Sequence, residues 1–302
     1  MKIFKSRTAV ITGGASGFGR EFALIAHRLG MNVVIADVQP DALDKTRAEL
    51  EALGAQVLAQ KTDVSKAESV QALADATMKR FGTPSLVFNN AGVGGTGGLV
   101  WENTLRDWEW VLGVNVWGVV HGVRIFTPLM LDAARKDPGF EAHIVNTASM
   151  AGLLTPPNMG IYNVSKHAVV ALTETLYQDL SLVTDQVGCS VLCPYFVPTG
   201  IHKSDRNRPA EFTDTAPLTA SQQIARAQSE KAVTSGKVSA SEVAELVFEA
   251  IAARQFYIYS HPKALGNVEQ RMRAIIDIKS PPDPFAARPE VGEKLRAQLR
   301  GA

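Results

Sequence analysis

The 302-residue chain has little cysteine, no excess charge of either sign and no long apolar run. Lys and Arg number 31 against 30 for Asp and Glu, so a net charge of +1 gives no global field that favours nucleic acid or an anionic membrane. No apolar run approaches the roughly 18 residues of a membrane-spanning helix. The N-terminus, MKIFKSRTAVITGG, becomes glycine-rich too soon for a signal peptide. We therefore expect a cytoplasmic protein that binds neither nucleic acid nor membrane.

The two cysteines, Cys189 and Cys193, both lie in the apolar run CSVLC. No further cysteine completes a zinc site, and the spacing is not that of a C-x-x-C redox pair. The six histidines contain no H-x-x-x-H pair. We therefore expect two reduced, buried thiols and no metal site.

Short β-branched runs alternate with longer helical patterns along the chain. Strands are expected at 8–12, 32–37, 56–63, 85–90, 143–149, 189–194 and 256–260. These runs are continuously apolar, as strands covered on both faces require. The alternation predicts an α/β fold, a single doubly wound domain over residues 1–302 with about seven parallel strands and helices on both faces.

The expected helices cover 17–29, 40–53, 66–80, 104–134, a segment that carries Tyr162, 219–232 and 241–254. Ser239 and Glu242 form a capping box before the last of these. Residues 198–238 form an insertion above the carboxyl edge of the sheet, which makes them a candidate substrate lid. The C-terminal extension, 261–302, contains the helical stretch VEQRMRAIID and then SPPDPFAARPE, for which we expect no regular structure.

A glycine-rich turn, TGGASGFG, follows the first expected strand at residues 12–19. Glycine supplies the backbone angles of such a turn and lets the backbone approach a pyrophosphate at a helix N-terminus. Asp37 ends the second strand 18 residues after Gly19, where its carboxylate can accept both ribose hydroxyls of NAD and repel the extra phosphate of NADP. Val38 and Gln39 follow, with no Arg or Lys to receive a phosphate. The sequence therefore favours NAD.

Tyr162 and Lys166 are four residues apart in IYNVSKHAVVAL, at the start of a helical pattern. The spacing places both side chains on one helix face. Taken alone, such a pair is more often surface decoration than a base with its tuning charge. An ammonium about 5 Å from the phenol, at an effective dielectric constant of about 20, would stabilise the phenolate by roughly 3 kcal/mol, or about two pKa units. Lys166 is therefore expected to lower the pKa of Tyr162 toward the working pH.

The spacing T-G-x-x-x-G-x-G of the glycine turn resembles that of the short-chain dehydrogenase/reductase family. Further matches follow in the family's order, namely Asp63-Val64, NNAG at 89–92, Asn115 in GVNVWG, and Ser149 thirteen residues before Tyr162. PYFVPTG at 194–200 is similar to the family's P-G-x-V-x-T segment, although Tyr195 stands where the family usually has glycine. The resemblance covers residues 8 to about 200 and implies a Rossmann-type fold and an NAD-dependent oxidoreductase.

The resemblance also implies roles for individual residues. Tyr162 would take the proton of a secondary alcohol while hydride passes to NAD, and Ser149 would hold the substrate oxygen. Lys166 would bind the nicotinamide ribose. Asn115 would order a water that links Lys166 to solvent, with an amide that braces a helix as the alternative. The residues implied to bind NAD are Gly13, Ser16, Gly17, Phe18, Gly19, Asp37, Val38, Asp63, Val64, Asn89, Ala91, Gly92, Tyr162, Lys166, Pro194, Val197 and Thr199.

The expected substrate pocket is mostly apolar or built of small residues. Its walls are the loops 93–98 and 153–159, Met150, Tyr195 and the start of the insertion. No arginine among them clearly demands a carboxylate, so we expect a hydrophobic or aromatic secondary alcohol or ketone. The C-terminal extension is weakly similar to that of family members that oxidise the benzylic alcohol of lignin aryl ethers.

Two other functions stay open at this point. One is an NADP-dependent carbonyl reductase on the same fold, against which Asp37 argues. The other is a nucleotide-sensing protein without catalysis, which would be expected to lack Ser149, Tyr162 or Lys166. Because family members commonly pair the fourth helix and the Tyr162 helix between subunits, we expect a homodimer or homotetramer.

Overall fold

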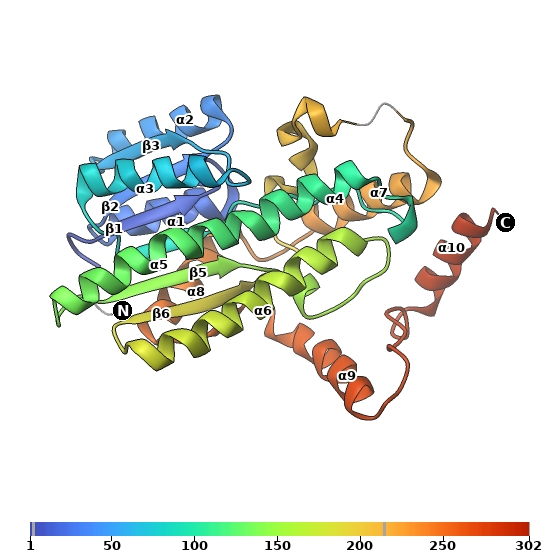
Figure 1. The fold of residues 1–302 in the computed structure, drawn as a ribbon. Coiled ribbons are helices and arrows are strands. Elements are labelled where there is room, and N and C mark those ends of the chain that lie inside the picture. Colours follow the sequence, from blue (N-terminus) through green and yellow to red (C-terminus); the bar gives the residue numbers. More distant parts are fainter. Residues whose placement is uncertain (2–3, 214–215, 302) are drawn as a thin grey trace.

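A parallel β-sheet runs through the centre of the protein (Figure 1). The computed structural model describes residues 1, 4–213 and 216–301. Within these residues the sheet has seven strands in the order β3-β2-β1-β4-β5-β6-β7, and all neighbouring strands are parallel, which confirms the predicted architecture. The strands are β1 (Thr8–Thr12), β2 (Asn32–Asp37), β3 (Val57–Lys61), β4 (Leu86–Asn89), β5 (Ala142–Thr147), β6 (Val187–Cys193) and β7 (Tyr257–Tyr259).

Helices cover both faces of this sheet. Helices α1, α2 and α8 pack on one face, and α3, α5 and α6 pack on the other. The order of the strands reverses between β1 and β4, so the connections that leave these two strands diverge and open a crevice at the carboxyl edge. The helices of the described residues are α1 (Gly17–Arg28), α2 (Pro40–Ala52), α3 (Ala67–Phe81), α4 (Leu105–Leu112), α5 (Gly118–Lys136), α6 (Gly160–Val183), α7 (Ala220–Thr234), α8 (Ala240–Ala252), α9 (Leu265–Ile276) and α10 (Pro289–Arg300).

Large apolar side chains fill the layers between the sheet and its helices. On the α1 face, the ring of Phe88 lies 4.4 Å from that of Phe22 and 5.6 Å from that of Phe248, centroid to centroid. On the other face, Phe126 and Met130 are fully buried. Burial of each such side chain stabilises the fold by about 1.5–3 kcal/mol relative to its exposure. The two layers hold the strand ends, and hence the crevice, in fixed positions.

The helix expected at 104–134 is interrupted once. Residues Gly113–Trp117 form a π turn between α4 and α5, and this turn carries the fully buried Asn115. Such wider turns are frequent at functional sites. The stretch Leu105–Lys136 is long and apolar enough to cross a membrane by length and composition, with 44% of its most apolar window buried. Because α5 packs against the sheet, this property is that of a core helix.

The C-terminal extension contains one helix that the sequence analysis did not predict. Helix α9 corresponds to the predicted helical stretch, and Figure 1 shows α9 and α10 projecting from the sheet and its covering helices. The expectation that 280–290 has no regular structure is wrong at its end, because Pro289 and Glu290 begin α10. Proline is tolerated there because the N–H groups of a first helical turn have no partner within the helix.

Both cysteines are free and buried, as expected. Burial raises the pKa of the Cys189 and Cys193 thiols to about 12. Because the thiolate is the reactive form, both side chains act as small apolar groups in the core.

His143 is a titratable group in the middle of the sheet, only 2% exposed. Its Nε2 lies 2.7 Å from Ser190 Oγ, and that hydroxyl donates its one hydrogen to the carbonyl of Gln255 at 2.7 Å. Ser190 can therefore only accept from the ring, so His143 carries a proton on Nε2. Burial lowers the pKa of His143 from 6.5 to about 3.

This buried histidine predicts a loss of stability in acid. The unfolded chain binds a proton at His143 near pH 6.5 and the native state only near pH 3, so the free energy of unfolding falls as the pH drops through this window. The full effect, reached below pH 3, is about 5 kcal/mol. His143→Gln keeps an amide that can bond Ser190 and does not titrate. Urea unfolding at several pH values should show a shallower acid decline for this variant; equal slopes would contradict the assignment.

Candidate active site

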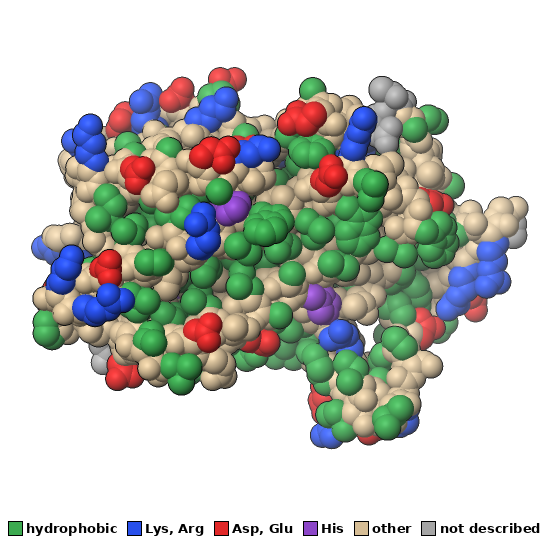
Figure 2. Space-filling model, in the orientation of Figure 1, with side chains coloured by type: hydrophobic (Ala, Val, Ile, Leu, Met, Phe, Trp, Pro, Cys, Tyr) green, Lys and Arg blue, Asp and Glu red, His purple; other side chains and the backbone are tan. Residues whose placement is uncertain are grey.

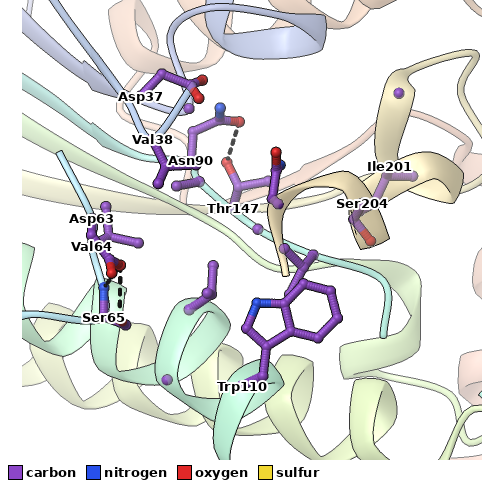
Figure 3. A pocket seen from close by; sticks show the side chains of 18 of the residues that line it. Asp37, Val38, Asp63, Val64, Ser65, Asn90, Trp110, Thr147, Ile201 and Ser204 are labelled. Atoms are coloured by element: carbon purple, nitrogen blue, oxygen red, sulfur yellow. Dashed lines mark hydrogen bonds between the residues drawn. The ribbon is translucent and has the colours of Figure 1, made fainter. Parts of the chain in front are cut away.

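Two adjoining cavities open at the carboxyl edge of the sheet. The smaller, about 320 Å³, lies over the ends of β1, β2 and β4, and the larger, about 860 Å³, lies beyond it under the insertion and the C-terminal extension. Tyr162 lines both cavities. Figure 3 shows the smaller cavity, with Asp37 and Asn90 on one side, Asp63 and Val64 on another, and Trp110 across from them.

The glycine turn forms the floor of the smaller cavity where β1 runs into α1. Gly13 and Gly17 have φ angles of +64° and +52°, which side chains rarely adopt. A Cβ on Gly13 would lie 2.9 Å from the Cα of Ala91, and one on Gly19 would lie 2.0 Å from the carbonyl oxygen of Gly13. The turn therefore leaves its backbone bare at the N-terminus of α1. This cradle fits the pyrophosphate of a dinucleotide.

Asp37 closes the far end of the smaller cavity. Its carboxylate accepts hydrogen bonds from the backbone N–H groups of Ala15 at 3.2 Å and Gln39 at 3.1 Å. Burial raises the pKa of this carboxyl group, and these bonds together with the charge of Arg206 oppose the rise. The carboxylate is thus held in place by the turn itself. Its position fits an acceptor of two ribose hydroxyls.

Arg206 is a residue that the sequence analysis missed at this site. It belongs to the insertion, lines the smaller cavity, and its Nε lies 3.4 Å from Oε1 of Gln39. Its guanidinium also donates to the carbonyls of Gly200 and Lys203. The sequence analysis found no basic residue near Asp37 because it compared Asp37 only with its neighbours in the sequence. Arg206 is 167 residues from Gln39, so only the fold brings them together.

Most of the residues expected to bind NAD line the smaller cavity. The cavity also includes Asn90 and Thr147, which the sequence analysis did not assign to the cofactor. The expected residues on its wall are Gly13, Ser16, Gly17, Phe18, Asp37, Val38, Asp63, Val64, Ala91, Gly92, Tyr162, Lys166, Pro194 and Thr199.

Three expected residues lie elsewhere. Gly19 lies beneath the turn, and Val197 lines the larger cavity. Asn89 is 2% exposed, and its amide donates to Asn146 at 2.8 Å inside the core. A Cβ on Gly122 of α5 would collide with the Asn89 side chain, so this amide faces α5 and not the cavity. The structure places the neighbouring Asn90 on the wall in its stead.

Asn90 belongs to a hydrogen-bond network that ties the strand ends together. Its Nδ2 donates to the carbonyl of Thr12 at 3.0 Å, and Thr147 donates to its Oδ1 at 3.2 Å, a bond drawn in Figure 3. The Thr12 hydroxyl donates to the carbonyl of Phe88 and accepts from the N–H groups of Asn90 and Ala91. The ends of β1, β4 and β5 are therefore held in one arrangement. The sequence signal that could have predicted this role is the position of Asn90, a polar residue directly after a buried strand.

The structure brings Ser149, Tyr162 and Lys166 together between the two cavities. Lys166 is 2% exposed, its Nζ donates to the carbonyl of Thr147 at 2.9 Å, and it lies 5.7 Å from the ring centroid of Tyr162. Ser149 follows β5 and lines the larger cavity, with Tyr162 within hydrogen-bonding reach. The three residues that the sequence spacing singled out, two on α6 and one after β5, therefore lie in one cluster.

The pKa values of this cluster correct one expectation from the sequence. Burial raises the pKa of Tyr162 to about 12, partly opposed by its hydrogen bond to Ser149, and burial lowers the pKa of Lys166 to about 8. The prediction that Lys166 alone brings the tyrosine toward neutral pH is wrong for the isolated chain. The reason is desolvation, which disfavours the charged form of both groups.

Asn115 is held by three hydrogen bonds in the π turn. Its Oδ1 accepts from the N–H of Val93 at 2.8 Å, and its Nδ2 donates to the carbonyl of Val93 at 2.9 Å and to Ser165 Oγ at 3.0 Å. The side chain thus connects the loop after β4 to the helix that carries Lys166. This arrangement is the bracing amide weighed as the alternative in the sequence analysis.

The insertion is fixed to α4 by a buried ion pair. Arg208 NH2 lies 2.8 Å from Oδ1 of Asp107, with the two side chains 11% and 5% exposed, and the guanidinium lies over the ring of Trp110. Burial acts to raise the pKa of Asp107, but hydrogen bonds from Thr96 and Thr104 and the Arg208 charge outweigh it and lower this pKa. Arg208 also donates to Thr96 at 3.1 Å. The ion pair therefore joins the insertion to the loop after β4.

The larger cavity has a mostly apolar inner wall and a more polar outer rim. Met150, Leu154, Met159 and Ile161 contribute to the inner part. The insertion and α7 form one side, and residues of the C-terminal extension form another. Arginines 226, 271 and 296 lie on the parts contributed by α7, α9 and α10. The sequence analysis found no arginine that clearly demands a carboxylate among the expected walls, because it counted only the start of the insertion, ahead of Arg226, and did not anticipate that the extension forms a wall.

Comparison with known proteins agrees with this geometry. The family described as short chain dehydrogenase matches residues 7–210. The chain is 35% identical over 284 residues to the CLA biosynthesis dehydrogenase/reductase of Lactiplantibacillus plantarum, covering 93% of this chain and 97% of that protein. It is 32% identical over 294 residues to the C alpha-dehydrogenase of Sphingobium sp. (strain NBRC 103272 / SYK-6), covering 96% and 93%.

A solved structure extends the comparison to the cofactor. The crystal structure of a short chain dehydrogenase/reductase from Burkholderia phymatum, in complex with NAD, has 54% sequence identity and a TM-score of 0.92, covering 95% of this chain and 100% of that chain. The chain therefore belongs to the short-chain dehydrogenase/reductase family. It is an NAD-dependent oxidoreductase, as the glycine cradle and Asp37 also indicate.

The arrangement of Asp37 and Arg206 predicts how cofactor choice can be changed. Asp37→Ser should weaken NAD binding about 10- to 100-fold, because the ribose hydroxyls lose a charged acceptor. It should also improve NADP binding, because a carboxylate no longer repels the phosphate and Arg206 remains nearby. Fluorescence titration of the protein with each nucleotide measures both effects. In the double variant with Arg206→Gln the improvement in NADP affinity should be smaller. An unchanged improvement would show that Arg206 does not contribute to NADP binding.

Proposed function

We propose that this protein interconverts a hydrophobic secondary alcohol and its ketone, with Tyr162 as the general acid and base. The observation that carries the proposal is the position of Tyr162, which lines both the smaller cavity over the strand ends and the larger cavity with its apolar inner wall. A proton-transfer group for this reaction must reach the substrate oxygen where the two cavities meet. Ser149 lines the larger cavity beside it, and Lys166 lies beneath its ring.

NAD held on the glycine cradle supplies the hydride acceptor, and its reduced form supplies the donor. Ser149 holds the carbinol or carbonyl oxygen by a hydrogen bond. In oxidation the Tyr162 oxygen takes the hydroxyl proton of the alcohol, and in reduction it returns the proton to the carbonyl oxygen. Asp37 would hold a ribose of the bound cofactor, the turn at Gly13 would hold its pyrophosphate, and Lys166 would bind the ribose next to the reacting centre.

Burial makes the two directions of this reaction different for Tyr162. With its pKa raised to about 12, the phenol is protonated at neutral pH and ready to act as an acid in ketone reduction. Oxidation needs the phenolate, so positive charge near the ring must offset the cost of burial. Lys166, with a pKa lowered to about 8, still carries most of its charge at pH 7 and loses it above pH 8. Its ammonium is therefore the chain's own source of that stabilisation.

Asn115 is proposed as a positioning residue in this reaction. It contacts Val93 and Ser165, and Ser165 Oγ donates to the carbonyl of Tyr162 at 2.8 Å. A Cβ on Gly92 would lie 3.3 Å from Asn115 Oδ1 and 3.5 Å from Lys166 Nζ, so the amide and the ammonium flank the same glycine. We infer that Asn115 fixes the distance between the loop after β4 and the catalytic lysine.

The larger cavity supports a hydrophobic substrate. Its inner wall is apolar, and Tyr195, where the family usually has glycine, adds an aromatic ring to the same wall. The two relatives described above are a dehydrogenase/reductase of CLA biosynthesis and a C alpha-dehydrogenase. We propose a substrate with an apolar or aromatic body, bound beneath the insertion.

Variants that remove the Tyr162 hydroxyl or the Lys166 charge test this mechanism. Tyr162→Phe lacks only the hydroxyl and should lose nearly all turnover of an aryl secondary alcohol while NAD affinity stays within about two-fold. Lys166→Met should lower the oxidation rate at pH 8 about 100-fold, because about 3 kcal/mol of phenolate stabilisation is lost. NADH absorbance across a pH series measures both. Substantial oxidation by the tyrosine variant would contradict the proposed role of its hydroxyl.

We also propose that the protein assembles as a homodimer or homotetramer through α5 and α6. Figure 2 shows hydrophobic side chains over the middle of this face, with few charged ones among them. Trp117, Tyr177, Leu182 and Val183 are between 46% and 81% exposed in the single chain. Water-exposed apolar groups of this size favour burial against a second copy.

Light scattering should therefore give a mass of at least two chains at micromolar concentration. Leu182→Glu places a charge at the end of α6, far from Tyr162 along the helix, and should shift the protein toward monomer. Ile278→Glu, a change at an exposed apolar residue of the C-terminal extension, is the matched control. A wild-type monomer would contradict the assembly and would leave the active-site proposal unaffected.

A further inference from the structure

Three arginines line the larger cavity, and they differ in their surroundings. Arg226 of α7 and Arg296 of α10 are exposed, and Arg296 lies 3.4 Å from Oδ2 of Asp283. Arg271 of α9 is half-buried and forms no ion pair with any described residue. A sheltered guanidinium without a carboxylate beside it can take its counter-charge from a ligand.

Most of the hydrogen-bonding capacity of Arg271 is unused. Its Nη1 donates to the carbonyl of Leu153 at 3.4 Å, a long bond to a neutral group. Its Nε and Nη2 have no partner among the described residues, and neither atom is closed off from solvent. The planar fork of a guanidinium matches a carboxylate or phosphate with two parallel N–H···O bonds. The Nε–Nη2 edge of Arg271 is therefore available to one oxyanion.

The helix face that carries Arg271 borders the cavity. Asn267, Gln270 and Arg271 all line it, and their spacing of three and four residues places them on one side of α9. Arg273, two residues further along, lies on the opposite side of the helix and is not part of the cavity wall. The α9 wall is thus polar, whereas the inner wall near Tyr162 is apolar.

The carboxylates of the same cavity leave Arg271 without a counter-charge. Asp283 is paired with Arg296 and also accepts from the N–H of Phe285 at 2.8 Å. Asp205 of the insertion forms no ion pair with a described residue. Among the described lining residues the arginines outnumber the carboxylates, so the cavity carries a net positive charge. This charge favours an anionic ligand over a neutral one.

The contact with Leu153 places the guanidinium relative to the reacting centre. Leu153 follows Ser149 by four residues, so their Cα atoms are at most about 14 Å apart. The tight turn Met150–Gly152 between them shortens that separation. The cavity of about 860 Å³ has room for one ligand that reaches both groups. An anion on Arg271 and an alcohol on Ser149 can therefore belong to one molecule.

We infer that Arg271 binds an anionic group, a carboxylate or a phosphate ester, at the far end of a hydrophobic substrate whose secondary alcohol reacts at Tyr162. The inference rests on the proposed function, because it presumes that the larger cavity holds the substrate. The apolar inner wall then holds the body of the substrate, and the guanidinium selects alcohols that carry a remote negative charge. A neutral substrate of the same length lacks this interaction and binds less well.

Matched substrate pairs test the selection. Each pair is a secondary hydroxy acid, ionised at pH 8, and its uncharged methyl ester. One series places the carbinol progressively farther from the carboxyl group, and a second series compares phosphate monoesters with their free alcohols. The wild-type protein should prefer the anionic member of at least one pair by about 10-fold or more in kcat/KM, measured by NADH absorbance. The series with the larger preference identifies the anion.

Arg271→Gln removes the charge and keeps a residue that favours a helix. It should lower kcat/KM about 10-fold more for the anionic member of a pair than for its neutral partner. Arg273→Gln is the matched control, because it removes the same charge from the same helix on the side away from the cavity. It should retain the wild-type preference. Arg271→Lys keeps a charge without the planar fork and should retain part of it.

The outcomes separate the inference from the proposed function. If the wild-type protein oxidises none of these alcohols, the proposed function fails and the inference fails with it. If it oxidises them without preferring an anion in either series, the inference fails and the function stands. The same conclusion follows if Arg271→Gln, with an unchanged thermal midpoint and NAD affinity, lowers both members of a pair equally, or if Arg273→Gln removes the preference to the same extent.

Discussion

The hydrogen bond from Lys166 to the carbonyl of Thr147 is the contact on which the geometry of the site depends. It joins α6 to the end of β5 at 2.9 Å and fixes the ammonium below the Tyr162 ring. It works because parallel strands end at one edge, where the Thr12 hydroxyl already links β1 to β4. The sheet thereby positions the cofactor cradle and the proton-transfer group against each other without any contribution from the outer segments.

The burial that holds Tyr162 and Lys166 in place also shifts the pKa values of both side chains. Lys166 and Tyr162 are both favoured in their neutral forms, which is the opposite of what attraction between an ammonium and a phenolate would produce. Desolvation is the largest cause of both shifts. At neutral pH the pair therefore rests as a phenol and a mostly charged ammonium, and it reaches the phenolate only when further positive charge is brought close to the ring.

The features of the structure that could be predicted from the sequence are those that depend on short local patterns of residues. The strands, the turn at Gly13, Asp37 and the Tyr162–Lys166 spacing follow from runs of neighbouring residues. The pattern could not predict Arg206 beside Gln39 or Arg208 against Asp107, because these contacts join residues about a hundred or more positions apart. The pKa of Tyr162 was predicted in the wrong direction because a sequence states the charge of a neighbour but not the depth of burial.

The two cavities are therefore formed by different segments of the chain. Strand ends and the glycine turn form the cofactor side, whereas the insertion, α7 and the C-terminal extension contribute much of the substrate side. The Asp107–Arg208 pair holds the first part of the insertion, and removal of either partner would leave a buried charge uncompensated at a cost of about 3–5 kcal/mol. A segment held this firmly does not open freely near Trp110.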